Sequence, residues 1–299
     1  MNFEKKSNKE IKKMTVKELE EYYASKRKYE YDMGKPIKGI ELRKKIHRLC
    51  LNVVKLDRIL SKEKIKVVQD NRGHINGPII YACTHIGGND IQRAFEAIDN
   101  HAYLFVADLG EMYRDILGKV LYLNGAICLN SGNKEDRHIA KERAVELLNK
   151  GGDLLIFPEG AWNVTDNLPV MKLFKGTIDM AKETKATIVP VAEDFRNKTT
   201  LVSIGAPINY DKIKDMPTEE ANKLLRDTLA SLKWKLWEKY PMEKRENITD
   251  EEKENFAMNI VNILNFGEGY QLEDVYRTRY KDKNEPTEEE VFSFAKKMK

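Results

Sequence analysis

His85 and Asp90 are the two residues of this sequence whose types and spacing best suit acid–base chemistry. A carboxylate close to an imidazole can hold one ring nitrogen as N–H, and the other nitrogen can then take a proton from a hydroxyl. Two structural alternatives stay open. Asp90 can serve as a helix cap, and a single loop histidine is more often structural than catalytic.

The residues around this pair predict a strand, a tight turn and a helix. Residues 78–83 form a short apolar run between turn residues, which indicates a buried strand. Gly87 and Gly88 let the backbone turn tightly before the helix that is expected to begin at Asn89 or Asp90. Such a turn lies at the carboxyl end of a sheet, where open α/β folds hold their ligands.

Two later stretches also place unusual residues at the ends of predicted strands. The apolar run 154–157 leads into Pro158, Glu159 and Gly160, and the run 188–192 contains Pro190. A Pro-Glu-Gly sequence on its own favours an ordinary turn. Beside a histidine–aspartate pair it becomes a candidate part of the same site.

Together, the His85-xxxx-Asp90, Phe157-Pro158-Glu159-Gly160 and Val189-Pro190-Val191 motifs resemble the glycerolipid acyltransferase family. The resemblance covers roughly residues 64–205. It implies a glycerol-3-phosphate acyltransferase-like α/β fold, with a mixed sheet flanked by helices. It also implies that His85 is the general base and that Asp90 orients it.

The resemblance further implies an O-acyltransferase that uses no cofactor and no metal. A fatty acyl group would pass from acyl-coenzyme A or acyl carrier protein to the hydroxyl of a lysophospholipid such as 1-acylglycerol-3-phosphate. Oxyanion donors are expected among the amides around Gly87 and Gly88. The residues expected to bind substrate are Phe157, Pro158, Glu159, Gly160 and Lys175.

The sequence lacks two arginines that phosphate-binding members of this family commonly carry. Ser131 and Trp162 occupy the matching positions, and neither can imitate the bidentate contact of arginine with phosphate. A replacement cation is one explanation. A non-phosphorylated or aminolipid acceptor is a second, and a non-catalytic lipid-binding protein is a third. The candidate cations are Lys134, Arg137, Lys172 and Lys175.

Composition excludes several other classes of protein. Charged residues make up 33% of the 299, and no apolar run approaches the ~18–20 residues of a membrane span. The amino terminus lacks the apolar segment of a secretory signal. Three scattered cysteines without a CxxC pair speak against a disulfide framework or a cysteine zinc site and fit a reducing cytoplasm. The sequence contains no G-x-S-x-G motif, which speaks against a serine hydrolase.

The amino-terminal region is basic and predicts contact with an anionic partner. Residues 1–60 hold 17 Lys or Arg against 9 Asp or Glu, a balance of +8, whereas the whole chain carries +4. Residues 40–60 predict a basic amphipathic helix, which suits a cytoplasmic protein bound peripherally on the inner face of the membrane. The alternative is that its apolar stripe packs on the domain. No nucleic-acid-binding motif is present.

The apolar periodicity divides the chain into three expected regions: a basic helical region over 1–62, an α/β core over 63–210, and a helical region over 211–299. The resemblance implies that the α/β core is the acyltransferase region. Residues 1–35 predict one charged helix capped at Thr15. The expected strands are 65–68, 78–83, 102–107, 126–129, 153–157, 187–192 and 200–204. The expected helices are 90–98, 112–123, 134–148, 171–185 and 218–240, with two more after Thr249 and Thr287.

Overall fold

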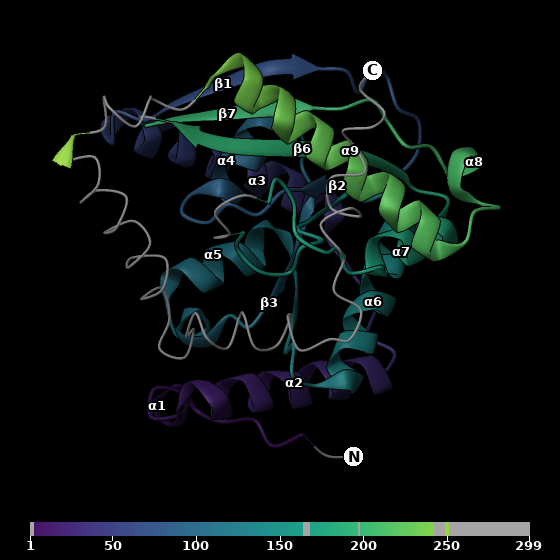
Figure 1. Ribbon diagram of the computed structural model, residues 1–299. Coiled ribbons are helices and arrows are strands. Elements are labelled where there is room, and N and C mark those ends of the chain that lie inside the picture. The colour runs from purple at the N-terminus through teal and green to yellow at the C-terminus, as the bar shows by residue number, and fades with distance from the viewer. Residues whose placement is uncertain (1–2, 164–167, 197, 242–248, 251–299) are drawn as a thin grey trace.

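A twisted seven-stranded sheet forms the centre of the protein (Figure 1). The computed structural model describes residues 3–163, 168–196, 198–241 and 249–250. The spatial order is β1-β7-β6-β2-β5-β3-β4. The strands are β1 (Lys64–Asp70), β2 (Ile79–Cys83), β3 (Tyr103–Ala107), β4 (Ala126–Leu129), β5 (Leu154–Ile156), β6 (Thr187–Arg196) and β7 (Thr199–Ile204).

The sheet is mixed, as predicted. Neighbouring strands are parallel except β6 and β7, which pair antiparallel. All seven expected strands are present, and β6 extends beyond the predicted end at residue 192 to Arg196. The carboxyl ends of β2, β5, β3 and β4 therefore lie along one edge of the sheet.

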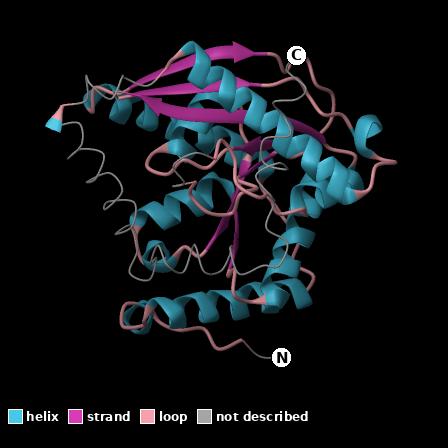
Figure 2. Cartoon of the chain, viewed as in Figure 1, coloured by secondary structure: helices cyan, strands magenta, loops and turns pink. Residues whose placement is uncertain are grey.

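Helices cover both faces of the sheet (Figure 2). The helices are α1 (Asn8–Ile11), α2 (Val16–Asp32), α3 (Ile40–Leu60), α4 (Asp90–Ile98), the 3-10 helix η1 (Gly110–Tyr113), α5 (Ile116–Gly125), α6 (Lys134–Asn149), α7 (Gly176–Thr184), α8 (Tyr210–Ile213) and α9 (Thr218–Lys239). Buried side chains of α6, α7 and α9 form one apolar cluster with the sheet. Those of α3 and α4 form another.

Three predicted helices differ from the structure. The single helix expected over 1–35 is two, because Thr15 caps α2 with Glu18 and ends the run from α1. The helix expected over 112–123 is divided into η1 and α5 around Asp115. The helix expected over 171–185 begins at Gly176 instead. The carboxyl-terminal helices expected after Thr249 and Thr287 lie outside the described residues.

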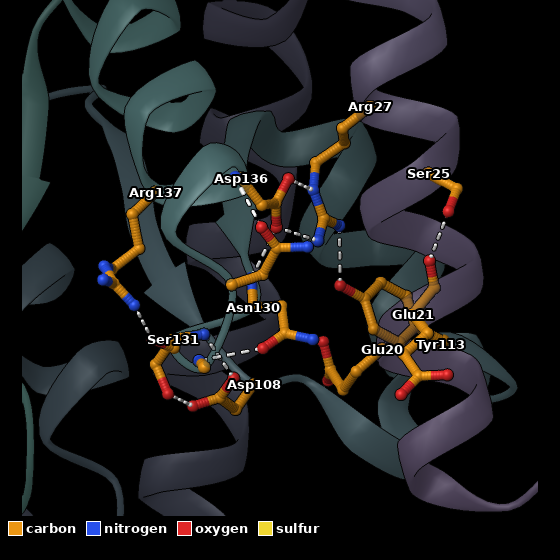
Figure 3. Close-up of polar contacts among 12 residues, drawn as sticks. Glu20, Glu21, Ser25, Arg27, Asp108, Tyr113, Asn130, Ser131, Asp136 and Arg137 are labelled. Atoms are coloured by element: carbon orange, nitrogen blue, oxygen red, sulfur yellow. Dashed lines mark hydrogen bonds and ion pairs between the residues drawn. The ribbon is translucent and has the colours of Figure 1, made fainter.

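Helix α2 is anchored on the domain by Arg27 (Figure 3). Its guanidinium donates to both carboxylate oxygens of Asp136, at 2.9 and 2.6 Å, and to the Tyr113 hydroxyl at 2.8 Å. Asp136 is buried in the first turn of α6 and also accepts the Asn130 amide at 2.7 Å. A bidentate, charge-assisted contact of this kind fixes both the position and the orientation of α2.

Helix α3 presents its apolar stripe to solvent. Leu49 and Val53 are 68% and 67% exposed, whereas His47 and Leu51 on the opposite side are buried. The alternative in which this stripe packs on the domain is therefore wrong. Ile116 of the adjacent helix α5 is 78% exposed and extends the same kind of surface. In the part of the chain that the structure describes, no helix is both long and apolar enough to span a bilayer.

Two buried histidines join α3 to the core and predict a loss of stability in acid. The His47 ring contacts the Asn124 side chain at 3.0 Å, and the His101 ring contacts the Asn124 carbonyl at 2.9 Å. Burial lowers the pKa of both imidazoles, that of His101 to about 4. The unfolded chain, with histidine pKa values near ~6.5, binds more protons below that pH, so stability falls as pH falls through ~6.5 toward ~4.

We expect the free energy of unfolding to drop by on the order of 1 kcal/mol through His101 between pH 7 and pH 5, after allowance for solvent screening. Urea unfolding at a series of pH values measures it. His101→Gln should flatten this slope, and His138→Gln, at an exposed position on α6, should leave it unchanged. Equal slopes in wild type and His101→Gln would contradict the prediction.

Candidate active site

His85 and Asp90 form a hydrogen-bonded pair directly after β2. His85 Nδ1 lies 2.7 Å from Asp90 Oδ2. The His85 side chain is 15% exposed, whereas that of Asp90 is buried at 1%. Because Asp90 accepts the Nδ1 proton, Nε2 is the nitrogen left to receive a proton from a substrate.

Asp90 also organises the turn that carries His85. Its Oδ2 accepts the amides of Ile86 and Gly87 at 2.9 and 2.8 Å, and its Oδ1 accepts the Ile91 amide at 2.7 Å. One carboxylate therefore contacts both the His85 ring and three backbone amides, whereas the N-cap position of α4 is Asn89. The Gly87 amide is committed to Asp90, so of the two glycine amides expected to meet an oxyanion, Gly87 is not available.

Glu159 holds the backbone of His85 in place. Its Oε1 accepts the His85 amide at 2.9 Å, and its Oε2 accepts the Met171 amide at 2.8 Å. The carboxylate is fully buried, and this burial raises the pKa of Glu159. The substrate-binding role expected for Glu159 stays a prediction, and in the structure its carboxylate accepts two backbone amides.

Residues 171–174, which precede α7, are paired with the Pro-Glu-Gly turn. The amide of Met171 bonds to Glu159, and the amide of Phe174 donates to the Pro158 carbonyl at 2.8 Å. Helix α7 begins after this segment, at Gly176. This long-range pairing between the turn and residues 171–174 leaves no local signal in the sequence.

The loop after β5 folds over His85. The Phe157 ring stacks on the imidazole with centroids 4.2 Å apart, and Gly160, at φ +63°, completes the turn. The Trp162 ring lies edge-on to the imidazole at 6.1 Å, and the Asn163 amide donates to the His85 carbonyl at 2.6 Å. The Phe157 ring, the Trp162 ring and the Asn163 amide therefore all lie against His85.

The positions of the two missing arginines have very different surroundings. Trp162 lies beside the candidate base, whereas Ser131 follows β4 and donates its amide to the Asp108 carboxylate at 2.8 Å. The Ser131 hydroxyl bonds to the same carboxylate, and the Arg137 guanidinium donates to the Ser131 carbonyl (Figure 3). Among the four candidate replacement cations, Arg137 lies at the Ser131 position.

Lys175 is separate from the His85 pair. It precedes the first turn of α7, is exposed, and its ammonium lies 3.6 Å from the Glu219 carboxylate of α9. Lys134 and Lys172 are also exposed. The residues that come together around the turn are His85, Asp90, Phe157, Pro158, Glu159 and Gly160. Lys175 lies outside this group and follows Phe174, whose amide donates to the Pro158 carbonyl.

The structure also reveals two polar residues that sequence patterns did not identify. Thr84 precedes His85, and its hydroxyl accepts the amide of Glu193, which is fully buried, at 2.9 Å. The signal available in the sequence was a Glu-Asp pair directly after the apolar run 187–192, since acidic residues are rarely buried without a partner. Among the described residues, no cluster of His, Cys, Asp or Glu is placed to hold a metal.

Comparisons with known proteins agree with this architecture. Residues 60–193 match the protein-family model described as Acyltransferase. The fold is similar to the crystal structure of the 1-acyl-sn-glycerophosphate (LPA) acyltransferase PlsC from Thermotoga maritima, with a TM-score of 0.54 and 17% sequence identity. The alignment covers 75% of this chain and 91% of that chain. No curated protein matches the sequence significantly.

Proposed function

Residues 60–193 belong to the acyltransferase family, and from this premise we propose that the protein is an O-acyltransferase acting on lysolipids. It moves a fatty acyl group from acyl-coenzyme A or acyl carrier protein to a lipid hydroxyl, with 1-acylglycerol-3-phosphate as the first candidate acceptor. The observation that carries the proposal is the 2.7 Å contact between His85 and Asp90 on the turn after β2.

The chemistry requires one proton transfer and no covalent enzyme intermediate. His85 Nε2 takes the proton of the acceptor hydroxyl as its oxygen attacks the thioester carbonyl. Asp90 stabilises the imidazolium that forms. When the tetrahedral intermediate collapses, the C–S bond breaks and the leaving thiolate receives the proton from His85. Pre-orientation of both substrates contributes on the order of 7–11 kcal/mol at best.

Two acceptor classes are supported by different observations. Arg137, beside the Ser131 carbonyl, can supply a cation for the phosphate of 1-acylglycerol-3-phosphate. Trp162 beside His85, and the Asp108 carboxylate that holds Ser131, favour a non-phosphorylated or aminolipid acceptor instead. The shared chemistry is acyl transfer to a lipid alcohol, and the headgroup separates the two candidates.

The test is acyl transfer by the purified full-length chain from labelled acyl-coenzyme A, and separately from acylated carrier protein, to a panel of acceptors. The panel contains 1-acylglycerol-3-phosphate, a neutral monoacylglycerol and a lyso-aminolipid. Preference for the phosphorylated acceptor that is lost in Arg137→Ala supports the first class. Preference for another acceptor supports the second. No product from any donor and acceptor would overturn the proposal.

We further propose that the protein binds a membrane surface peripherally, through the basic amino-terminal helices together with α5. The docking face consists of exposed apolar residues on two adjacent helices, and exposed Lys45, Arg48 and Lys119 lie on the same helices. Apolar side chains can enter the acyl boundary while the cations meet anionic headgroups. The apolar residues of this face are Leu42, Leu49, Val53, Leu56, Leu60, Ile116, Val120 and Leu123.

Replacing Leu49, Val53 and Leu56 together by serine is expected to weaken binding to anionic phospholipid vesicles by about tenfold or more. A fully buried aliphatic side chain contributes roughly 1.5–3 kcal/mol, and partial insertion of three side chains contributes a fraction of that sum. Vesicle co-sedimentation measures the partition coefficient. The matched control replaces Val67 and Phe195, which are also exposed but lie outside this face, by serine. Unchanged partitioning of the triple variant would contradict the docking face.

A further inference from the structure

Glu193 lies on the strand next to β2, at the level of the candidate base. β2 and β6 are parallel with Cys83 opposite Val191, so Glu193, two residues further on, is level with His85. Val189 and Val191 belong to the apolar cluster beneath α4, and side chains alternate along a strand. The Glu193 side chain therefore points to the sheet face that is covered by α4, the helix that begins at Asp90.

The Glu193 carboxyl has no hydrogen-bond partner for either oxygen among the described residues, although the side chain is fully buried. Its backbone is well tied, because its amide donates to Thr84 and its carbonyl accepts the Lys233 ammonium. Leaving a buried carboxyl unpaired is unfavourable for folding, and an apolar residue of similar size would avoid this cost. The position is therefore poorly explained by stability alone.

Four charged or titratable groups influence this carboxyl electrostatically. Asp90 and Arg93 come from α4, Cys83 comes from β2 and Lys233 from α9. The two cations have other carboxylates as partners: Arg93 bonds to Glu63 at 2.6 Å and Lys233 lies 3.0 Å from Asp194. Neither of them bonds to the Glu193 carboxyl.

Burial, followed by the negative charge of Asp90, raises the pKa of Glu193 well above its usual range. Lys233 and Arg93 oppose this rise with smaller effects. A buried carboxyl without a partner is disfavoured in its charged form, so the neutral form is favoured and ionisation needs a more alkaline pH than for an ordinary glutamate. Ionisation adds a second negative charge under the turn that holds His85 and Asp90.

We propose that Glu193 is a positioning residue that strengthens His85 as a base when its carboxyl ionises. The imidazolium that forms as His85 takes the acceptor proton is stabilised by a second carboxylate beneath Asp90, in a site of low dielectric constant. The protein then transfers acyl groups faster in alkaline conditions than a lone His85–Asp90 pair would allow. This inference rests on the proposed function.

The test is the pH profile of kcat/KM for acyl transfer by the full-length protein between pH 6 and pH 10, corrected for uncatalysed thioester hydrolysis. We expect the wild type to show a second rise of about 3- to 10-fold above neutral pH. Glu193→Gln keeps a neutral isostere and should reach a single plateau near the neutral-pH rate. Glu193→Met, which is apolar and of similar length, should do the same if the glutamine variant folds poorly.

Glu20→Gln provides a matched control. Glu20 is also buried with one oxygen unpartnered, and burial raises its pKa to about 7, but it lies on α2 and bonds to the Gly110 amide. The alkaline rise should persist in this variant. Superimposable profiles of wild type and Glu193→Gln, or no alkaline rise in the wild type, would overturn the inference. If the profiles superimpose but His85→Ala loses activity, the inference about Glu193 fails and the proposed function stands. If His85→Ala keeps its activity, both the inference and the proposed function fail.

Discussion

Replacing His85 by alanine is expected to lower kcat for acyl transfer by about 10²- to 10⁴-fold, the usual contribution of a positioned general base. The loss concerns a single function, because Nδ1 is held by Asp90 and Nε2 is the atom to which the proposal assigns the hydroxyl proton. KM for the acceptor should change much less than kcat, since the proton moves in the transition state and not on binding.

The fold should tolerate this change. The His85 backbone keeps its bonds to Glu159 at 2.9 Å and from Asn163 at 2.6 Å whatever the side chain is. Asp90 also keeps the amides of Ile86 and Gly87. Circular dichroism and the thermal midpoint verify this, and His138→Ala at an exposed position is the matched control. A His85→Ala variant that retains a third or more of the wild-type kcat would refute the assignment of the base.

Replacing Asp90 by asparagine is expected to cost a similar factor, about 10²- to 10⁴-fold in kcat. The amide is neutral, so it cannot stabilise the imidazolium as a carboxylate does, and it can hold the imidazole in the wrong tautomer. Its NH₂ group also cannot accept the Ile86 and Gly87 amides, which Asp90 Oδ2 accepts at 2.9 and 2.8 Å.

Asp90→Asn should therefore lose stability as well as activity, by about 1–3 kcal/mol for a buried donor left unpaired. Activity is measured well below the thermal midpoint of the variant, so that the fraction folded does not limit the rate. Asp99→Asn is the control, because Asp99 lies beyond the end of the same helix and forms an exposed ion pair with Lys55 at 3.5 Å. Equal kcat values for Asp90→Asn and wild type would mean that Asp90 only holds the backbone of the turn and does not support His85.

The sequence predicts the fold class well because its strongest signals are local. β2 and β5 are short apolar runs bounded by turn residues, and such runs form buried strands wherever they pair. The helix from Asp90 follows from the spacing of Ala94, Phe95 and Ile98, all of which are buried. The pairing of His85 with Asp90 follows from the same spacing, since a short turn leaves the two side chains close together.

What the sequence does not predict depends on contacts between distant residues. Helix α7 begins at Gly176, after a segment in which the Met171 and Phe174 amides bond to the turn after β5. Glu159 accepts the backbone amides of His85, which precedes it by 74 residues, and of Met171, which follows it by 12. The sequence predicts that α3 is amphipathic, but it does not determine which side of the helix packs on the domain. In the structure that side carries His47 and Leu51, and the apolar stripe faces solvent.

The replacement of the family arginines illustrates the same limit. Four cations in the sequence qualify by type, and spacing alone does not rank them. The structure places Arg137 at Ser131 because the first turn of α6 directly follows the loop after β4. Lys175 is drawn instead toward Glu219 of α9, a residue from a distant part of the chain.

The most direct measurement of the central claim is a single-turnover experiment that follows the acyl group. The full-length protein, in excess over labelled acyl thioester, is mixed with the preferred lysolipid and stopped with acid at intervals. In the proposed mechanism His85 acts as a base on the acceptor. We therefore expect the label to pass from the thioester to the lipid ester with none bound to protein, and His85→Ala to slow this single step. Label that accumulates on the protein before the ester, or appears as free fatty acid alone, would contradict direct base-assisted transfer.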